Sequence, residues 1–335
     1  MTQAIHRDIQ ESRGKFMYTL GIDLGGTNIA VGVVNENYEI VGRGKIKTNA
    51  NRPEEEIIAD MAKACFIALE DAGLTLSDIS SVGIGTPGSV DPKTGYVLVS
   101  NNISFSNTPM VDILKTHLGD DIKYYLENDA NAAAFGEYLA GAGKGTKDFV
   151  IVTLGTGVGC GIVIDGKLFT GTNYAGAEAG HTVIVYDGED CTCGRKGCWE
   201  AYASATALIN QTKAAMLKNK DSKMWEMVGG DISKVNGLTA FDGMRNGDAA
   251  AKTVVDNYIN YIACGITNLV NVFQPDLLSI GGGISHEGDN IVVPIRKFVE
   301  RERFSKNVAK QTKINTARLG NDAGIIGAAC LYKNY

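Results

Sequence analysis

The order of apolar and polar positions along this chain predicts strands first and helices afterwards. Short apolar runs at 17–23, 29–34 and 38–46, separated by turn-forming residues, predict three consecutive strands. Pro53 then opens a helix, because proline is favoured at the first helical position, and Gly73 closes it. Six apolar residues at helical spacing predict its buried face: Ile57, Ile58, Met61, Cys65, Phe66 and Leu69.

Alternating strands and helices follow. Apolar runs at 82–85 and 122–126 predict strands, and the segments 111–118 and 129–139 predict helices. Alternation of this kind is typical of α/β proteins, in which helices cover a largely parallel sheet.

The strand pattern of the first residues is then repeated. A strand at 149–154, a glycine- and threonine-rich turn and a strand at 160–164 repeat the arrangement of residues 17–34. An internal repeat of this kind predicts two lobes built on one plan. Further on, Asp248 is a candidate cap for a long helix. The remaining predicted elements are helices at 203–217, 248–273 and 323–331 and a strand at 277–280.

The repeat predicts how the chain is divided. Residues 1–16 are polar and aperiodic, and we expect them to be a flexible N-terminal extension. Residues 17–134 form an N-terminal α/β lobe that is joined by the final helix, 320–335. Residues 135–319 form a C-terminal α/β lobe that carries a cysteine-rich loop.

That loop, at 176–200, has the most specific chemical pattern. Cys191, Cys193 and Cys198 follow His181 at short spacing, and three thiolates with one imidazole make the tetrahedral set of a closed structural zinc site. Ordinary buried cysteines would not explain the polar residues around them, and Cys191 and Cys193 are too close in sequence to form a disulfide comfortably. Three nearby glycines let the backbone fold tightly around an ion: Gly180, Gly194 and Gly197.

The two glycine-rich turns predict a phosphate site. Backbone N–H groups in such turns bind phosphate oxygens, and Asp23, at the end of the preceding strand, can hold a water on Mg²⁺. A plain hairpin turn is the alternative for either turn alone, but two such turns together favour a polyphosphate. The residues concerned are Gly25, Gly26, Thr27, Asn28, Gly155, Thr156 and Gly157.

Other glycine-containing segments are less specific. The first turn is followed by a strand, so it is not a Rossmann fingerprint. The segment 141–147 is P-loop-like, but Gly145 stands where Ser or Thr is required, and we expect a surface loop. Gly281, Gly282 and Gly283 follow a buried strand and leave bare backbone for adenosine; a tight strand-to-helix turn is the alternative.

Asp129 is the candidate catalytic base. With Glu127 and Asn128, it lies between a predicted strand and an alanine-rich helix. A carboxylate there can take the proton from a substrate hydroxyl as the oxygen attacks phosphorus. The alternative role is a helix N-cap, which aspartate commonly fills.

Composition narrows the classes of function. The net charge is −6, and no Lys/Arg run is long enough to follow a phosphate backbone, so we expect no nucleic acid partner. No apolar run approaches the ~20 residues of a membrane span. An odd number of cysteines, seven, without a signal peptide predicts a reducing, cytoplasmic setting. Four of them are predicted to be buried thiols: Cys65, Cys160, Cys264 and Cys330.

In their order, these motifs resemble the ROK family (repressor, open reading frame, kinase), and the match is closest to its bacterial glucokinases. The resemblance runs from residue 17 to residue 335. The motifs that carry it are Asp23-x-Gly-Gly-Thr27, Glu127-Asn-Asp-Ala-Asn131, Leu154-Gly-Thr-Gly-x-Gly159, Gly176-x-Glu-x-Gly-His181 and Cys191-x-Cys-Gly-x-x-Gly-Cys-x-Glu200.

The resemblance implies an actin/hexokinase-like fold of two α/β lobes with a cleft between them. It implies phosphorylation of a sugar 6-hydroxyl, with glucose as the expected substrate, ATP and Mg²⁺ as cofactors and Asp129 as base. It also implies that one nitrogen of His181 binds zinc while the other faces the sugar, and, by analogy, a homodimer. Phe105 replaces a usual tryptophan in an apolar wall. The positions implied to contact the sugar are Asn102, Asn128, Asp129, Glu178, His181 and Glu200.

Two rivals remain at this point. The first is a kinase for another hexose, such as N-acetylmannosamine, N-acetylglucosamine, allose or fructose, or one that uses polyphosphate as donor. The second is a non-catalytic, sugar-sensing repressor, a branch of the family that carries an N-terminal helix-turn-helix domain. Residues 1–16 are too short for such a domain, and the presence of Asp129 favours catalysis.

Overall fold

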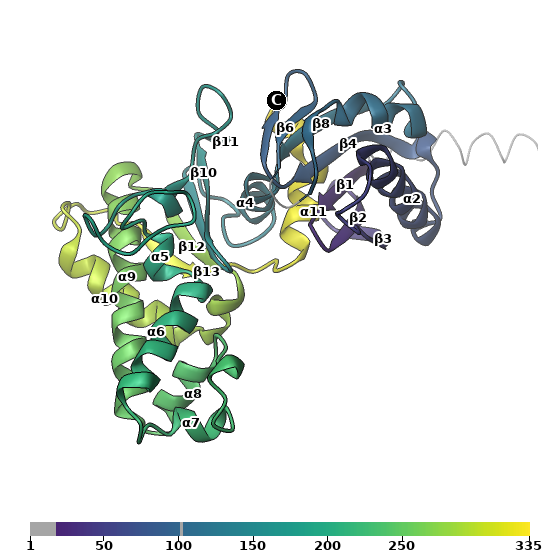
Figure 1. The fold of residues 1–335 in the computed structure, drawn as a ribbon. Coiled ribbons are helices and arrows are strands. Elements are labelled where there is room, and N and C mark those ends of the chain that lie inside the picture. The colour runs from purple at the N-terminus through teal and green to yellow at the C-terminus, as the bar shows by residue number, and fades with distance from the viewer. Residues whose placement is uncertain (1–17, 101–102) are drawn as a thin grey trace, which may run out of the picture. The chain divides into compact units, whose positions relative to one another are not determined.

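The structure is a computed structural model that describes residues 18–100 and 103–335. Residues 1–16, predicted to be an extension, and Asn102, a predicted sugar contact, lie outside the described residues. The described chain divides into two compact units (Figure 1). The first holds the chain up to Lys144 together with Thr170–Ala175 and Asn321–Tyr335, and the second holds Gly145–Phe169 and Gly176–Gly320.

The first unit is built on a five-stranded sheet. Its first three strands form an antiparallel meander, and the other two run parallel to β1 and to each other, which gives the order β3-β2-β1-β4-β8. The three strands predicted at the start of the chain are thereby confirmed. The strands are β1 (Tyr18–Leu24), β2 (Asn28–Val34), β3 (Ile40–Lys47), β4 (Ile79–Thr86) and β8 (Lys123–Asn128).

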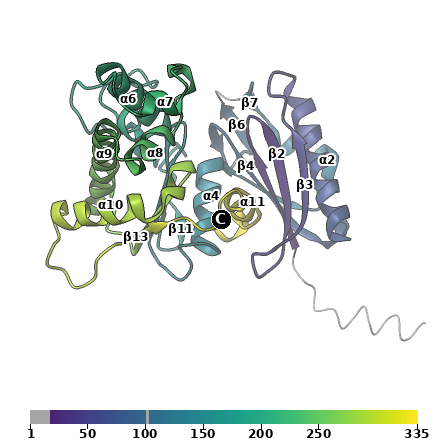
Figure 2. The same ribbon diagram turned by 90° about the horizontal axis from the view of Figure 1, so that it is seen from below.

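Helices cover both faces of this sheet, as Figure 2 shows. The helix α2 (Glu54–Ala72) packs on β2 and β3, and α11 (Asp322–Ala329) packs on β1 and β4. Two more helices complete the unit: α3 (Met110–Leu118) and α4 (Asp129–Leu139). As predicted, α2 ends at Gly73, which has a left-handed backbone (φ 66°).

For one residue of α2, Phe66, the predicted position in the buried face is wrong. Phe66 is 46% exposed, whereas the other five predicted positions are buried. The reason is that α2 sits closer to β3 on its alanine side, where Gly42 and Gly44 have no side chain: a Cβ on Gly44 would lie 2.0 Å from the Ala64 carbonyl oxygen. Phe66 therefore falls beyond the edge of the buried stripe.

The helices α4 and α11 cross at very short distance. A Cβ on Gly327 would lie 1.7 Å from the Ala132 carbonyl oxygen, and one on Gly136 would lie 2.1 Å from that of Ala323. Glycine is the residue that permits such an approach of two backbones. This contact fixes the position of α4, whose first residue is Asp129.

A small antiparallel sheet that the hydrophobic pattern does not predict lies between β4 and α3. Its strands are too short to give a periodic signal. Phe105, in the loop before the last of them, is 2% exposed and packs in the core of the unit. The strands are β5 (Ser89–Asp91), β6 (Tyr96–Val99) and β7 (Ser106–Thr108).

The second unit repeats the sheet of the first. Three antiparallel strands are again followed by two parallel ones, in the order β11-β10-β9-β12-β13. This confirms the internal repeat that the sequence predicts. The strands are β9 (Phe149–Leu154), β10 (Val158–Ile164), β11 (Lys167–Leu168), β12 (Leu277–Gly281) and β13 (Lys313–Thr316).

Most helices of the second unit pack around α9, which buries an apolar face. Its predicted cap is confirmed: the Asp248 carboxylate accepts from the Ala251 N–H at 2.8 Å. The predicted helix 203–217 is confirmed as α6, which begins two residues later because Ser204 is extended and caps it. The helices are α5 (Glu200–Ala203), α6 (Ala205–Lys218), α7 (Met224–Met227), α8 (Thr239–Arg245), α9 (Ala249–Phe273) and α10 (Asp289–Glu302).

Short 3₁₀ helices connect these elements: Leu76–Asp78, Ala179–His181, Ile232–Lys234, Gly283–Glu287 and Leu331–Lys333. Among residues 18–100 and 103–335, no helix combines the length and the apolar character that crossing a membrane requires.

Candidate active site and metal centre

Asp129 is the first residue of α4 and directly follows β8. The cap of this helix is Asn128, whose Oδ1 accepts from the N–H groups of Ala130 and Asn131 at 2.9 and 3.3 Å. The alternative role considered for Asp129 therefore belongs to its neighbour. Asp129 Oδ1 accepts from the Ala130 N–H (2.9 Å), and the carboxylate keeps further lone pairs for a substrate.

The Asn128 side chain is held at both ends. Its Nδ2 donates to the Gly88 carbonyl oxygen at 3.0 Å, while Oδ1 caps α4. A sugar contact by Asn128 would have to use the second hydrogen of Nδ2 or share Oδ1, so this contact stays a prediction.

The carboxyl groups of Asp23 and Asp129 influence each other within the first unit. Burial, and then the negative charge of Asp129, raise the pKa of Asp23 to about 6. Burial also raises the pKa of Asp129. Burial and the Asp129 charge disfavour the ionised form of Asp23. A divalent cation beside Asp23 would offset this effect, because an opposite charge favours the ionised form. The residues present thus fit the predicted Mg²⁺ water contact.

Space for the Asp23 carboxylate comes from a helix almost at the other end of the sequence. A Cβ on Gly324, in α11, would lie 2.7 Å from Asp23 Oδ2. Sequence reasoning missed Gly324 because only the tertiary contact of α11 with β1 reveals its role.

The first glycine-rich turn joins β1 to β2 and is held by Thr48. The Thr48 hydroxyl donates to the Gly25 carbonyl oxygen at 2.6 Å, and its N–H donates to that of Thr27 at 3.0 Å. Gly26 and Thr27 are exposed. Within the described residues, Asn28 Oδ1 is buried and has no hydrogen-bond partner. This oxygen is therefore available to accept a hydrogen bond from a ligand.

The second turn joins β9 to β10 and is held by α5 and α6. Glu200 Oε2 accepts from the Val158 N–H at 2.9 Å. The Ala205 N–H donates to the Gly155 carbonyl oxygen at 2.8 Å, and the Thr206 hydroxyl donates to that of Thr156 at 2.8 Å. One carboxylate oxygen of Glu200, predicted to bind sugar, is therefore already used by the turn.

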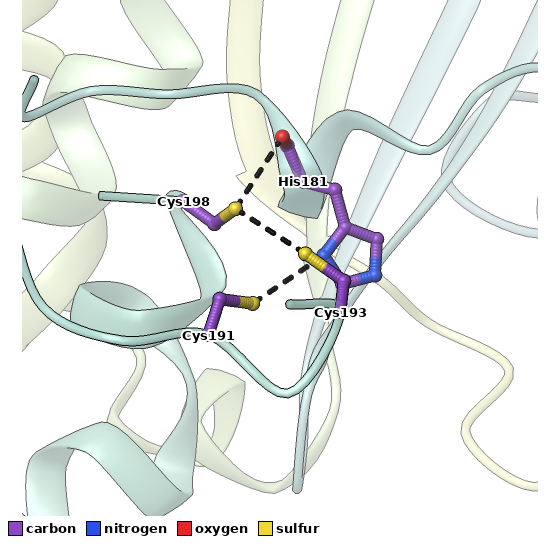
Figure 3. Close-up of side chains that lie close together, drawn as sticks. All are labelled: His181, Cys191, Cys193 and Cys198. Atoms are coloured by element: carbon purple, nitrogen blue, oxygen red, sulfur yellow. Dashed lines mark hydrogen bonds between the residues drawn. The ribbon is translucent and has the colours of Figure 1, made fainter. Parts of the chain in front are cut away.

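Figure 3 shows the four predicted zinc ligands gathered around one point. Their ligand atoms all lie within 4.8 Å of one another. Cys193 Sγ and Cys198 Sγ are 3.6 Å apart, as are Cys191 Sγ and His181 Nδ1. With metal–ligand bonds of about 2.0–2.3 Å, two ligands of a tetrahedral zinc ion lie about 3.7 Å apart. The cluster fits zinc, and the sulfur distance exceeds the ~2.05 Å of a disulfide.

The backbone of the cysteine loop is shaped for this convergence. Gly197 has a left-handed backbone (φ 75°), and a Cβ there would lie 1.7 Å from the Val185 carbonyl oxygen. The loop ends at Trp199, which is fully buried and whose Nε1 donates to the Tyr261 carbonyl oxygen at 2.8 Å. This anchors the loop on α9.

The thiols of Cys193 and Cys198 differ in the direction of their pKa shifts. A hydrogen bond from the Arg195 N–H lowers the pKa of Cys193. Burial and the two neighbouring thiols raise the pKa of Cys198 to about 12. A cation at the centre would favour the thiolate form of all three cysteines.

Three of the residues predicted to bind sugar belong to the cysteine loop: His181, which is a member of the cluster, and Glu178 and Glu200. Glu178 is exposed, and His181 and Glu200 are partly buried. His181 Nδ1 faces Cys191, so Nε2 is the nitrogen left for another contact, and its contact with a sugar stays a prediction.

A cavity of about 860 Å³ opens in the second unit. Its lining includes Thr156, Cys191 and Glu200, with the remainder mainly from α6 and α9, and does not include His181 or Glu178. Its volume is that of a small-molecule site.

The other two glycine segments have structural explanations. Gly282 has φ 80°, and a Cβ there would lie 2.4 Å from the Leu154 carbonyl oxygen, so a tight turn into a 3₁₀ helix accounts for it. The segment 141–147 is a loop, as expected, and the amides of Ala142 and Gly143 are paired with Glu137. Nucleotide contacts by Gly281, Gly282 and Gly283 stay a prediction.

Comparisons with known proteins agree with the motifs. The ROK family profile matches residues 19–335. A glucokinase of Halalkalibacterium halodurans is 36% identical over 318 residues, 94% of each chain. The crystal structure of a ROK family glucokinase from Streptomyces griseus, in complex with glucose and AMPPNP, is similar with a TM-score of 0.76 and 36% identity, covering 94% of this chain and 98% of that one.

A relative of another class is more distant. A xylose repressor of Caldicellulosiruptor bescii is 26% identical over 314 residues, which cover 93% of this chain and 77% of the repressor. The family profile and the glucokinase identities both span nearly all of the described chain. The protein belongs to the ROK family, and its fold is the two-lobed, hexokinase-like α/β fold of that family's sugar kinases.

Proposed function

We propose that this protein is an ATP-dependent glucokinase that transfers the γ-phosphoryl group of ATP to the 6-hydroxyl of glucose. The observation that carries the proposal is the state of Asp129: it is partly buried at the start of α4, directly after β8, its pKa is raised, and the capping of α4 is done by Asn128 instead. The similarity to proteins named glucokinase, at 36% identity, supports glucose as the sugar.

In this mechanism Asp129 accepts the proton of the sugar hydroxyl as its oxygen attacks the γ-phosphorus. A raised pKa brings a carboxylate closer to the working pH, which strengthens it as a base. The N–H groups of the turns at Gly25–Thr27 and Gly155–Gly157 stabilise the phosphate charge. Mg²⁺, when bound beside Asp23, neutralises phosphate oxygens.

The second unit supplies the proposed sugar contacts. Nε2 of His181 donates a hydrogen bond to a sugar hydroxyl, and the carboxylates of Glu178 and Glu200 accept hydrogen bonds from sugar hydroxyls. Asn102 and Asn128 are the other proposed sugar contacts. Zinc held by His181, Cys191, Cys193 and Cys198 fixes the ring of His181 in one tautomer and orientation. Four protein ligands leave no position for a metal-bound water, so the role of the metal is structural.

The test is a coupled assay of ADP release with Mg-ATP and a panel of hexoses, on protein whose zinc content has been measured. We expect glucose to give the highest kcat/KM by far, with zinc near one per chain. A higher kcat/KM for N-acetylmannosamine or another hexose would identify that sugar as the substrate in place of glucose, and the assignments of the base and the metal ligands would be unaffected. No turnover of any sugar by zinc-replete protein would instead favour the sensing role of the repressor branch.

We propose further that the enzyme works in the cytoplasm as a homodimer. All seven cysteines are free thiols, which is in keeping with a reducing compartment. Sedimentation at micromolar concentration measures the oligomeric state.

A further inference from the structure

Glu127 is a buried carboxylate next to the proposed base. It lies in β8, two residues before Asp129, and its exposed fraction is 0%. Burial raises the pKa of Glu127, and the hydrogen bonds that the carboxylate accepts from Asn131, Asn128 and Tyr335 act in the opposite direction. A buried carboxylate is costly unless its oxygens accept hydrogen bonds, so the donors around it define what it does.

Two of these donors come from the strand–helix junction itself. Glu127 Oε1 accepts from the Asn128 N–H at 2.8 Å and from Asn131 Nδ2 at 3.1 Å. The first donor lies in the last residue of β8 and the second in the first turn of α4. The carboxylate therefore ties the end of the strand to the start of the helix, across Asp129.

The third donor comes from far away in the sequence. The Tyr335 hydroxyl donates to Glu127 Oε2 at 3.0 Å. Burial and the nearby Glu127 charge raise the pKa of Tyr335, which keeps the phenol protonated and able to donate. Its ring stacks on Tyr125, also in β8, with centroids 6.1 Å apart and an interplanar angle of 12°. The last described residues thus run beside β8 (Figure 1).

We propose that Tyr335 is a positioning residue for the catalytic junction: its hydroxyl holds the Glu127 carboxylate, which in turn holds the backbone N–H of Asn128 before Asp129 and the side chain of Asn131 after it. The proposal deepens the proposed function and rests on Asp129 being the base. Its physical reason is that small displacements of a reacting group are costly for the rate, on the order of 10²-fold for about 1 Å.

The isosteric change Tyr335→Phe keeps the ring stack and removes the hydroxyl. Glu127 Oε2 then loses its donor, and the junction loosens. We expect kcat to fall about tenfold while KM for glucose and for ATP changes less than twofold, because Tyr335 contacts neither substrate in this account. The matched control is Tyr332→Phe, in the same segment, whose phenol interacts with Lys333; we expect it to keep the wild-type kcat.

A double-mutant cycle separates positioning from general stability. If Tyr335 acts through Glu127, then Tyr335→Phe in a Glu127→Gln background lowers kcat no further than Glu127→Gln alone. Additive losses in the cycle, an unchanged kcat in Tyr335→Phe, or equal losses in Tyr335→Phe and Tyr332→Phe would each overturn the proposal.

A second readout does not depend on turnover. Hydrogen exchange at the Asn128 and Asn131 amides should accelerate in Tyr335→Phe and not in Tyr332→Phe, with the circular dichroism of both variants unchanged. Equal exchange in both variants overturns the proposal. If exchange responds as expected but wild-type protein turns over no sugar, the proposed function fails while the contact of Tyr335 with the junction stands.

Discussion

The two units share one sheet order but differ in the side chains at the ends of corresponding strands. In the first unit Asp23 stands two residues before Gly25 of the turn, and in the second unit Thr153 stands two residues before Gly155. The strand pairing around both positions is the same, with the second strand returning antiparallel. The two units therefore share the backbone arrangement of strand, turn and strand. Only the first unit has a carboxylate, Asp23, at this position before the turn.

The turns also differ in what holds them. The first turn is held by Thr48, which directly follows β3, while the second turn is held by Glu200 and the start of α6. Glu200 is the last residue of the cysteine loop, so the residue that holds the second turn lies in the same loop as Cys191, Cys193 and Cys198. In the proposed mechanism, the first unit therefore carries the proton transfer, and the second carries the sugar-binding surface beside the proposed zinc site.

The largest expected effect concerns the carboxylate chemistry of the first unit. Asp129→Asn should lower kcat by about 10²–10⁴-fold, the usual contribution of a general base, while calorimetry finds glucose affinity within a few-fold of wild type. Asp112→Asn, an exposed aspartate of α3, is the control. Retention of a third of the wild-type kcat would remove Asp129 from the role of base.

The next effect concerns the metal cluster of the second unit. Cys198→Ser should reduce zinc content, measured by plasma emission, to below about a tenth of wild type and lower Tm by several degrees, because structural zinc contributes directly to folding. Cys160→Ala removes a buried thiol of β10 outside the cluster and should keep its zinc. Normal zinc content in Cys198→Ser would contradict the ligand set.

Asp23 allows a test through stability. Its folded pKa, about 6, exceeds the ordinary 3.8, so folding favours the protonated form, and the stability it contributes is present below pH 3.8 and lost as pH rises through 6. Without nucleotide, Asp23→Asn should therefore raise the free energy of unfolding at pH 8 by at most about 3 kcal/mol, from roughly two pKa units at 1.36 kcal/mol each.

At pH 4 this advantage should nearly vanish, and Mg-ATP should bind the variant more weakly than wild type. The measurement is denaturation followed by circular dichroism at both pH values. A variant that is less stable than wild type at pH 8, or equally stabilised at pH 4 and pH 8, would show that the Asp23 carboxylate is not penalised by its surroundings.

The smallest effect concerns the support of the second turn. Glu200→Gln keeps an oxygen for the Val158 N–H but loses the charge that strengthens the bond. We expect KM for ATP to rise two- to fivefold, with zinc content unchanged. Glu189→Gln, in the same loop, is the matched control. An unchanged KM for ATP would mean that the turn does not depend on this carboxylate.

The fold could largely be predicted from periodicity. The strands β9 and β12 and the helix α4 lie where the apolar pattern places them, to within a residue, because each is a continuous run with clear breaking residues on both sides. The pattern does not predict α10, since Pro294 lies inside it and proline normally ends a helix. The displaced Phe66 depends on glycines in β3, which periodicity within α2 cannot reveal.

The site was harder to predict where it depends on tertiary contacts. Cysteine spacing and residue type were sufficient to predict that His181, Cys191, Cys193 and Cys198 converge, because they are close in sequence. The cap of α4 needed the structure, because Asn128 and Asp129 are both good caps by residue type. Gly324 and Tyr335 contact Asp23 and Glu127 across most of the chain, and no local pattern marks them.

The most direct test of the central claim is identification of the product by phosphorus and carbon NMR after incubation of glucose with Mg-ATP. The account predicts glucose 6-phosphate and ADP from the wild-type protein, and no detectable product from Asp129→Asn over the same time. A phosphoryl group on another oxygen of the sugar, or equal product from both proteins, would contradict it.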